Sequence, residues 1–122
     1  MLAVLDWELC TLGDVLADMG QLLVYWTEAG DNRPALGTAP TIVPGFLTRN
    51  EVRARYAHRS GRNVADLDFY IAFAYWKVAC IIEGVYSRYR AGAGGGDVTA
   101  VDNYERQVGH LAEMSKAAAE RL

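Results

Sequence analysis

The sequence predicts a mainly α-helical domain with about four helices and one short strand near its N-terminus. Apolar residues recur at helical spacing in four segments, and glycine or proline separates these segments. Only one brief apolar run, residues 2–5, has the pattern of a buried strand. With 122 residues, the chain is long enough for one domain and too short for two of ordinary size. We therefore expect a single domain over residues 1–122, with a strand and turn over residues 1–13 and a helical part over residues 14–122.

The strand is expected to deliver acidic residues to its end. The apolar residues 2–5 lead directly into the acidic stretch at residues 6–8. A turn at residues 13–14 follows, and a first helix is predicted over about residues 15–29, with Gly30 as its stop. The apolar positions at helical spacing in this segment are Leu16, Met19, Leu22, Leu23 and Trp26.

A loop and a second helix come next. Residues 31–46 are predicted to form a loop, because repeated proline removes backbone donors and fixes φ. Thr48 and Glu51 then have the spacing of a capping box, so a helix should run to Arg59 and close at Gly61. Four arginines of this helix are interpreted as a solvated face: Arg49, Arg53, Arg55 and Arg59.

The longest predicted helix covers about residues 65–90 and is apolar around most of its circumference. A membrane span needs about twenty apolar residues with few charges. Asp68, Lys77 and Glu83 interrupt this run, so we interpret it as a helix buried on several sides of a soluble bundle and expect no membrane partner.

The C-terminal segment is predicted to form the last helix. Residues 91–96 are a glycine-rich connector without the ending of a phosphate-binding loop. Asp97 or Thr99 can cap a helix over about residues 100–121. Its apolar stripe consists of Val101, Tyr104, Val108, Leu111 and Met114.

Composition excludes several classes of protein. The net charge of -3 argues against a nucleic-acid partner. Cys10 and Cys80 are too far apart in the sequence to indicate a disulfide framework or a clustered metal site, and free thiols suit a reducing compartment. The N-terminal residues show no basic region followed by an apolar signal core, so we expect a cytoplasmic protein.

Acidic residues near the N-terminus offer the clearest chemistry. His58 and His110 stand alone, and no Gly-x-Ser-x-Gly occurs. Four acids instead fall within thirteen residues: Asp6, Glu8, Asp14 and Asp18. A carboxylate at the end of a buried strand needs a cation or hydrogen-bond donors, and Mg²⁺ commonly binds one or two carboxylates together with substrate phosphates. Asp14 and Asp18 are better interpreted as a cap and a brace of the first helix.

The pattern Asp6-Trp7-Glu8, followed by Gly13-Asp14 and Asp18, resembles the metal-binding segment of aminoglycoside phosphotransferases and choline-kinase-like enzymes. That family has Asp-Trp/Phe-Glu followed by Gly-Asp-Pro-x-x-Asp. Three later stretches resemble a branch that includes the kinase-like domain fused to some acyl-CoA dehydrogenases. They are residues 44–49, residues 56–62 and residues 69–74.

The resemblance implies the helical C-terminal lobe of a protein-kinase-like fold, with Mg²⁺ and ATP as the cofactors of the complete enzyme. By this resemblance Asp6 binds Mg²⁺, Glu8 lies beside the metal, and Asp18 braces the catalytic loop. Val15 replaces the usual proline, a mild change at a helix start. The phosphate-covering loop, the strand lysine and the catalytic loop of such enzymes precede the Asp6 motif. We therefore expect a C-terminal part of an ATP-dependent small-molecule phosphotransferase that binds neither cofactor tightly and is inactive alone.

Two other functions are compatible with the sequence. The first is a non-catalytic interaction module, in which the apolar surface of the helix at residues 65–90 forms a homo-oligomer or receives a missing N-terminal lobe. The second is an unrelated ligand-binding bundle. The candidate substrate contacts in a complete enzyme are Trp26, Glu28, Asp31, Tyr70, Trp76 and Lys77, although the aromatic residues among them are better interpreted as core.

Overall fold

The computed structural model describes residues 3, 10, 12–31, 35, 39–92 and 101–122. These residues form mainly helix, which confirms the predicted fold class. The elements are α1 (Val15–Tyr25), the 3-10 helix η2 (Pro40–Ile42), α2 (Arg49–Ser60), α3 (Leu67–Arg90) and α4 (Val101–Ala119). The strand predicted at residues 2–5 lies outside the described residues apart from Ala3, and so do the predicted caps Asp97 and Thr99.

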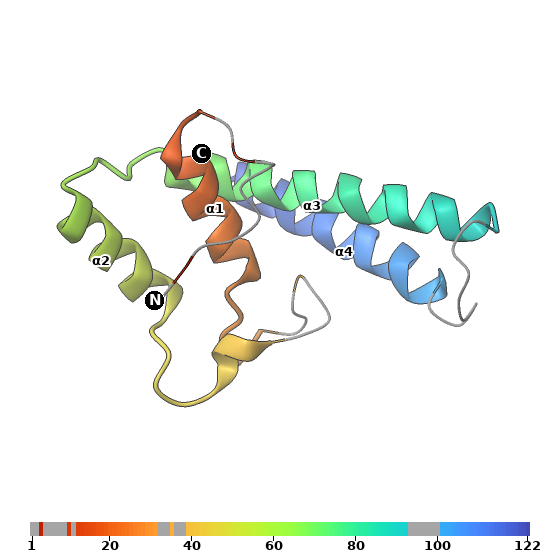
Figure 1. The fold of residues 1–122 in the computed structure, drawn as a ribbon, viewed down its shortest axis with the longest axis horizontal. Helices are drawn as coiled ribbons and strands as arrows, with labels where there is room; N and C mark the ends of the chain where they lie inside the picture. Colours follow the sequence, from red (N-terminus) through yellow and green to blue (C-terminus); the bar gives the residue numbers. More distant parts are fainter. Residues whose placement is uncertain (1–2, 4–9, 11, 32–34, 36–38, 93–100) are drawn as a thin grey trace.

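The long helices α3 and α4 lie side by side and run in opposite directions (Figure 1). Their contact is built from small and aliphatic side chains, which let the two backbones approach closely. The Ser115 hydroxyl of α4 also donates a hydrogen bond to the Ala72 carbonyl of α3 at 2.9 Å. The residues buried along this contact include Ala72, Val78 and Ala79 of α3 and Leu111 and Ala118 of α4. The two helices lie along the longest dimension of the molecule (Figure 1).

Helix α1 packs across the first turns of α3 (Figure 1). A side-chain cap from Asp14 begins α1, and Leu16, Met19 and Leu23 then pack against Leu67, the first residue of α3. Burying such side chains contributes about 1.5–3 kcal/mol each. This apolar cluster fixes the position of α1 on the first turn of α3.

Helix α1 ends at Tyr25, whereas the sequence predicted helix to residue 29. The helix ends early because residues after Tyr25 form hydrogen bonds with distant parts of the chain. Trp26 turns to an extended conformation, and its indole N–H donates to the Leu47 carbonyl at 2.7 Å. The next residue, Thr27, is buried, and its backbone N–H and carbonyl both bond the Thr41 hydroxyl of η2 at 2.8 Å. These bonds replace the helical ladder and join the end of α1 to the following loop.

Helix α2 forms as its local signals predicted. Thr48 and Glu51 make both bonds of the capping box, and Gly61 closes the helix with a φ of 67° in the left-handed region. No residue of α2 is fully buried. The helix rests on the core through the half-buried side chains of Val52 and Tyr56, which pack on the α1 cluster.

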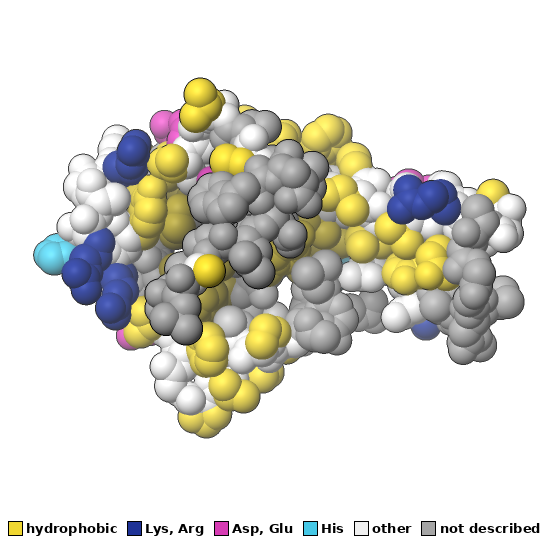
Figure 2. Space-filling model, viewed as in Figure 1, with side chains coloured by type: hydrophobic (Ala, Val, Ile, Leu, Met, Phe, Trp, Pro, Cys, Tyr) yellow, Lys and Arg dark blue, Asp and Glu magenta, His cyan; other side chains and the backbone are white. Residues whose placement is uncertain are grey.

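The expectation that the longest helix is buried on several sides is wrong. Phe69, Phe73 and Trp76 of α3 are 51%, 43% and 56% exposed, so the interpretation of Trp76 as a core residue is also wrong. Hydrophobic side chains lie over α3 on the face shown in Figure 2. By length and composition α3 could also cross a membrane, although core helices of soluble proteins pass the same test. Hydropathy alone did not reveal that, among the described residues, one side of α3 meets α1 and α4 while its aromatic side chains remain exposed.

Replacing Gly20 with alanine tests the close contact between α1 and α3. An added Cβ would lie 2.6 Å from the backbone C and O of Tyr70, which a side-chain rotation cannot relieve. We expect Gly20→Ala to lower the free energy of unfolding by about 1–3 kcal/mol in urea denaturation.

The matched control is Gly109→Ala in α4, where nothing lies within 4 Å of the added Cβ. Alanine there should raise the free energy of unfolding by up to about 1 kcal/mol. Equal effects of the two substitutions would contradict the described packing of α1 on α3.

Candidate functional site

The residues predicted to bind a metal, Asp6 and Glu8, lie outside the described residues. Within the part of the chain that the structure describes, no group of three or more His, Cys, Asp or Glu side chains gathers around a point that could hold a metal ion. The structure therefore gives no geometry for Asp6 and Glu8, and their role as ligands stays a prediction.

Asp14 connects the start of α1 to α3. Its Oδ1 accepts from the backbone N–H of Leu16 at 2.9 Å, and its Oδ2 accepts from the Tyr70 hydroxyl at 2.8 Å. The Leu16 amide first, and then the Tyr70 hydroxyl, hold the pKa of the Asp14 carboxyl below its ordinary value. Asp18 lies exposed in the first turn of α1, four residues further on.

The densest set of polar contacts in the described residues surrounds Arg49, at the start of α2. Its Nη1 donates to Glu28 Oε2 at 2.9 Å and to Asp31 Oδ1 at 3.1 Å, and its Nη2 donates to Asp31 Oδ2. Its Nε donates to the Leu23 carbonyl at 3.2 Å, and its backbone N–H donates to Glu28 Oε1 at 2.6 Å. We call Arg49, Glu28 and Asp31 the Arg49 cluster. It joins the end of α1, the turn after it and the start of α2.

The charges of the Arg49 cluster stabilise each other. Burial raises the pKa of Asp31, but the hydrogen bonds from Arg49 and the Glu28 amide, with the charge of Arg49, outweigh burial and leave that pKa below its ordinary value. Burial likewise lowers the pKa of Arg49, and the paired acids more than reverse this effect. A cation at a helix N-terminus is unfavourable toward the helix dipole, so the two carboxylates also compensate for the position of Arg49.

Most of the predicted substrate contacts are engaged in holding the fold. Glu28 and Asp31 are paired with Arg49. Trp26 donates to Leu47 and packs edge-on against Phe46, with ring centroids 5.7 Å apart. Of the other candidates, Tyr70 donates a hydrogen bond to Asp14 and so also holds the fold. Trp76 and Lys77 are exposed on α3.

Sequence reasoning missed the part played by Arg49. The signal was its position directly after the Thr48 cap, where a positive charge opposes the helix dipole. A cation placed there indicates acidic partners nearby, and Glu28 and Asp31 come from the segment that had been interpreted as helix end and loop.

Removing Arg49 leaves two half-buried carboxylates without their partner. The side chains of Arg49, Glu28 and Asp31 are 28%, 31% and 26% exposed. We expect Arg49→Ala to lower the free energy of unfolding by about 1–3 kcal/mol near pH 7. Arg106→Ala, on an exposed position of α4, removes the same charge and should have little effect in the same urea titration.

The deficit of Arg49→Ala should depend on pH in a defined direction. Because the folded pKa of Asp31 is lowered, its contribution to stability is complete above its ordinary value of 3.8 and is lost as the pH falls through the folded pKa. The difference between wild type and Arg49→Ala should therefore shrink below about pH 4. A deficit that is constant from pH 7 down through this range would contradict an ionic role of Asp31.

Comparisons with known proteins give a partial match. The chain is 37% identical over 98 residues to "Acyl-CoA dehydrogenase family member 11" of Mus musculus, which covers 75% of this chain and 12% of the relative. It is 31% identical over 98 residues, with the same coverage, to "Probable acyl-CoA dehydrogenase IBR3" of Arabidopsis thaliana. The match to "Acyl-CoA dehydrogenase family member 11" of Gallus gallus is 32% identical and covers all of this chain and 16% of the relative.

These relatives correct the family drawn from the motifs. They are named as acyl-CoA dehydrogenase family members and not as phosphotransferases, so the assignment to the aminoglycoside phosphotransferase and choline-kinase-like family is wrong. No family model matches the chain, and no solved structure matches it. The chain spans about one eighth of the length of the first curated relatives it matches. It is similar to one segment of much longer proteins named as acyl-CoA dehydrogenase family members.

Proposed function

We propose that this chain forms the helical part of a phosphotransferase-like unit within a longer polypeptide, and that it does not transfer phosphate by itself. The observation that carries the proposal is the position of Asp14. The acidic stretch at residues 6–8 is separated by four residues from Gly13-Asp14, and Asp14 is bonded to both α1 and α3. A chain anchored in this way can hold a nearby carboxylate in a fixed relation to a helical scaffold.

Carboxylates are suitable ligands for Mg²⁺, and Asp6 and Glu8 are the residues that would hold it in such a unit. A bound Mg²⁺ supplies charge neutralisation for the phosphoryl group in transfer. The described residues contribute to this by fixing the start of α1 through Asp14, whose carboxylate accepts hydrogen bonds from the Leu16 amide of α1 and the Tyr70 hydroxyl of α3.

The lysines of the chain support the proposed lack of independent activity. Phosphotransferases of the protein-kinase type hold the ATP phosphates with a lysine on a strand. This chain has two lysines, and both lie on helices. Lys77 is exposed on α3, and Lys116 on α4 forms an exposed ion pair with Glu120 at 3.9 Å. Neither is placed to hold the phosphates of a nucleotide.

Activity measurements on two lengths of the polypeptide test this proposal. The purified chain with Mg·ATP should release no ADP above the buffer rate and give no heat of tight binding in calorimetry. The longer polypeptide that contains the chain should turn over ATP, and Asp6→Ala should reduce that rate by about a hundredfold or more. The control Glu113→Ala, at an exposed position of α4, should leave the rate unchanged.

ATP turnover by the isolated chain that Asp6→Ala abolishes would contradict the proposed dependence on other parts of the polypeptide. A longer polypeptide whose turnover is the same in wild type and Asp6→Ala would contradict the proposed role of Asp6.

A second candidate function is a helical association module, favoured by the aromatic strip on α3. Phe69, Phe73 and Trp76 follow each other at intervals of four and three residues, so they share one helix face. The rings of Phe73 and Trp76 lie 5.8 Å apart, and all three side chains are about half exposed. Contiguous exposed apolar surface of this kind is typical of association sites. A second copy of the chain, presenting the same strip, is the proposed partner.

Light scattering coupled to size exclusion tests self-association. Wild type should elute as a dimer or higher oligomer, and the variant Phe73→Asp/Trp76→Asp should be monomeric, because a buried unpaired carboxylate is costly in an apolar interface. Ala117→Asp, at an exposed position of α4, is the matched control and should keep the wild-type mass. A monodisperse wild-type monomer that binds no hydrophobic dye would rule out the association module.

A further inference from the structure

The arginines of α2 divide into two pairs with different surroundings. Arg49 belongs to the cluster described above, and Arg53 donates to Asp68 at 3.2 Å and to the Val64 carbonyl at 3.0 Å. Arg55 and Arg59 are exposed, and neither forms an ion pair or a hydrogen bond with another described residue. One pair therefore holds α2 in place, and the other faces outward.

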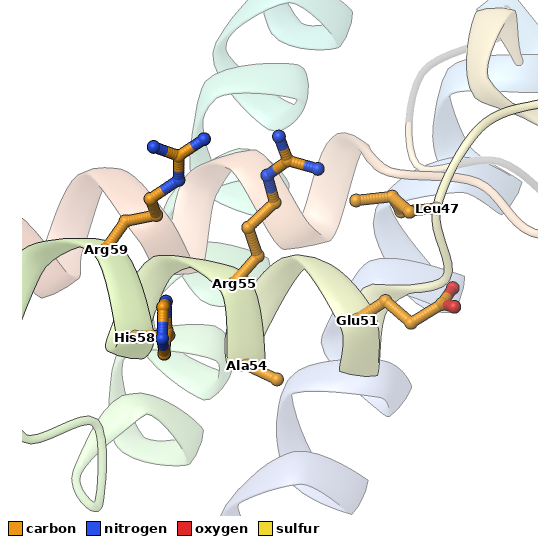
Figure 3. Close-up of a pocket in the computed structure, with 6 residues that line it drawn as sticks. All are labelled: Leu47, Glu51, Ala54, Arg55, His58 and Arg59. Atoms are coloured by element: carbon orange, nitrogen blue, oxygen red, sulfur yellow. The ribbon is translucent and has the colours of Figure 1, made fainter.

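The outward pair borders a shallow hollow of about 480 Å³ (Figure 3). The guanidinium groups of Arg55 and Arg59 extend from the same side of α2, and Leu47 lies beside them on that side. The remaining lining residues are Glu51, Ala54 and His58. The hollow thus combines two cationic groups with an apolar surface contributed by Leu47 and Ala54.

The acidic residue of the hollow forms no ion pair with either arginine among the described residues. The Glu51 carboxylate accepts from the Thr48 backbone N–H at 2.7 Å and from the Thr48 hydroxyl at 2.8 Å, as part of the capping box. In Figure 3 it points away from the two guanidinium groups. Basic side chains also gather over α2 in Figure 2, although the chain as a whole carries a net charge of -3. The positive charge is a local feature of this helix.

Helix stability does not account for Arg55 and Arg59 as a pair. Arg59 lies in the last turn, where a cation is favourable toward the helix dipole. Arg55 lies a full turn earlier and gains little from the dipole. Glu51, four residues before Arg55, is directed to Thr48 and forms no ion pair with Arg55, whereas the like charges of Arg55 and Arg59, also four residues apart, repel each other across the helix surface. An anion placed between the two guanidinium groups would remove this repulsion and accept hydrogen bonds from both, since the planar guanidinium matches phosphate oxygens bidentately.

We propose that the hollow formed by Arg55, Arg59, Leu47 and Ala54 binds a soluble organic phosphate. Its terminal phosphate or diphosphate lies between the two guanidinium groups, and a less polar part of the molecule covers Leu47 and Ala54. The site depends on α2 and the residue before its cap, and it does not require Asp6 or the phosphotransferase role proposed above.

Calorimetric titration of the chain with inorganic pyrophosphate tests the anion site directly. Wild type should bind with a dissociation constant that rises with salt, as expected of charge-assisted contacts. The variant Arg55→Gln/Arg59→Gln should bind at least about tenfold more weakly. The control Arg88→Gln/Arg106→Gln removes the same charge from exposed positions of α3 and α4 and should bind within about twofold of wild type. Circular dichroism should show equal helix content in all three proteins.

Two results would overturn the proposal. Equal affinities in both double variants, or no binding by wild type at millimolar pyrophosphate, would show that the pair is only a solvated face. Sedimentation with phosphatidylcholine vesicles that contain phosphatidylserine distinguishes the other source of phosphate. Binding to these vesicles that Arg55→Gln/Arg59→Gln abolishes, without binding of pyrophosphate, would assign the surface to a membrane and contradict a soluble ligand.

Discussion

The guanidinium group of Arg49 makes the largest set of polar contacts that join α2 to the end of α1. Arg49 reaches from the first residue of α2 to two carboxylates in the turn after α1 and to a carbonyl within α1 itself. Besides these bonds, α2 is held by the contacts of Arg53 with Asp68 and the Val64 carbonyl and by the half-buried side chains of Val52 and Tyr56, because it buries no residue completely. The Arg49 cluster therefore helps to position the groups on α2, the outward arginines included.

At the start of α1, too, one charged side chain bonds two parts of the structure. Asp14 satisfies an amide that the helix geometry leaves without a partner, and it also takes the Tyr70 hydroxyl of α3. Asp14 at the start of α1 thus connects this helix to α3, and Arg49 of α2 connects α2 to α1 and to the turn after it. The two bonds of Asp14 fix the start of α1 to α3.

Features that depend on neighbouring residues in the sequence could be predicted, and those that depend on distant ones could not. The bounds of α2 follow from Thr48, Glu51 and Gly61, whose preferences are local. The end of α1 was missed because Trp26 exchanges a helical position for a bond to Leu47, twenty-one residues away. The exposed side of α3 was missed because the hydropathy of a helix does not show on how many sides other helices pack against it. The acids Glu28 and Asp31 were noticed, but their partner Arg49 was interpreted as part of a solvated face.

The central claim is that Arg49 and Asp31 stabilise the fold through each other and not through separate effects. A double-mutant cycle of Arg49→Ala and Asp31→Ala, measured by urea denaturation at neutral pH, tests it most directly. The account predicts a coupling free energy of about 1–3 kcal/mol, with the double variant losing much less stability than the sum of the single variants. Additive effects, with a coupling near zero, would contradict the claim and with it the view that this cluster positions α2.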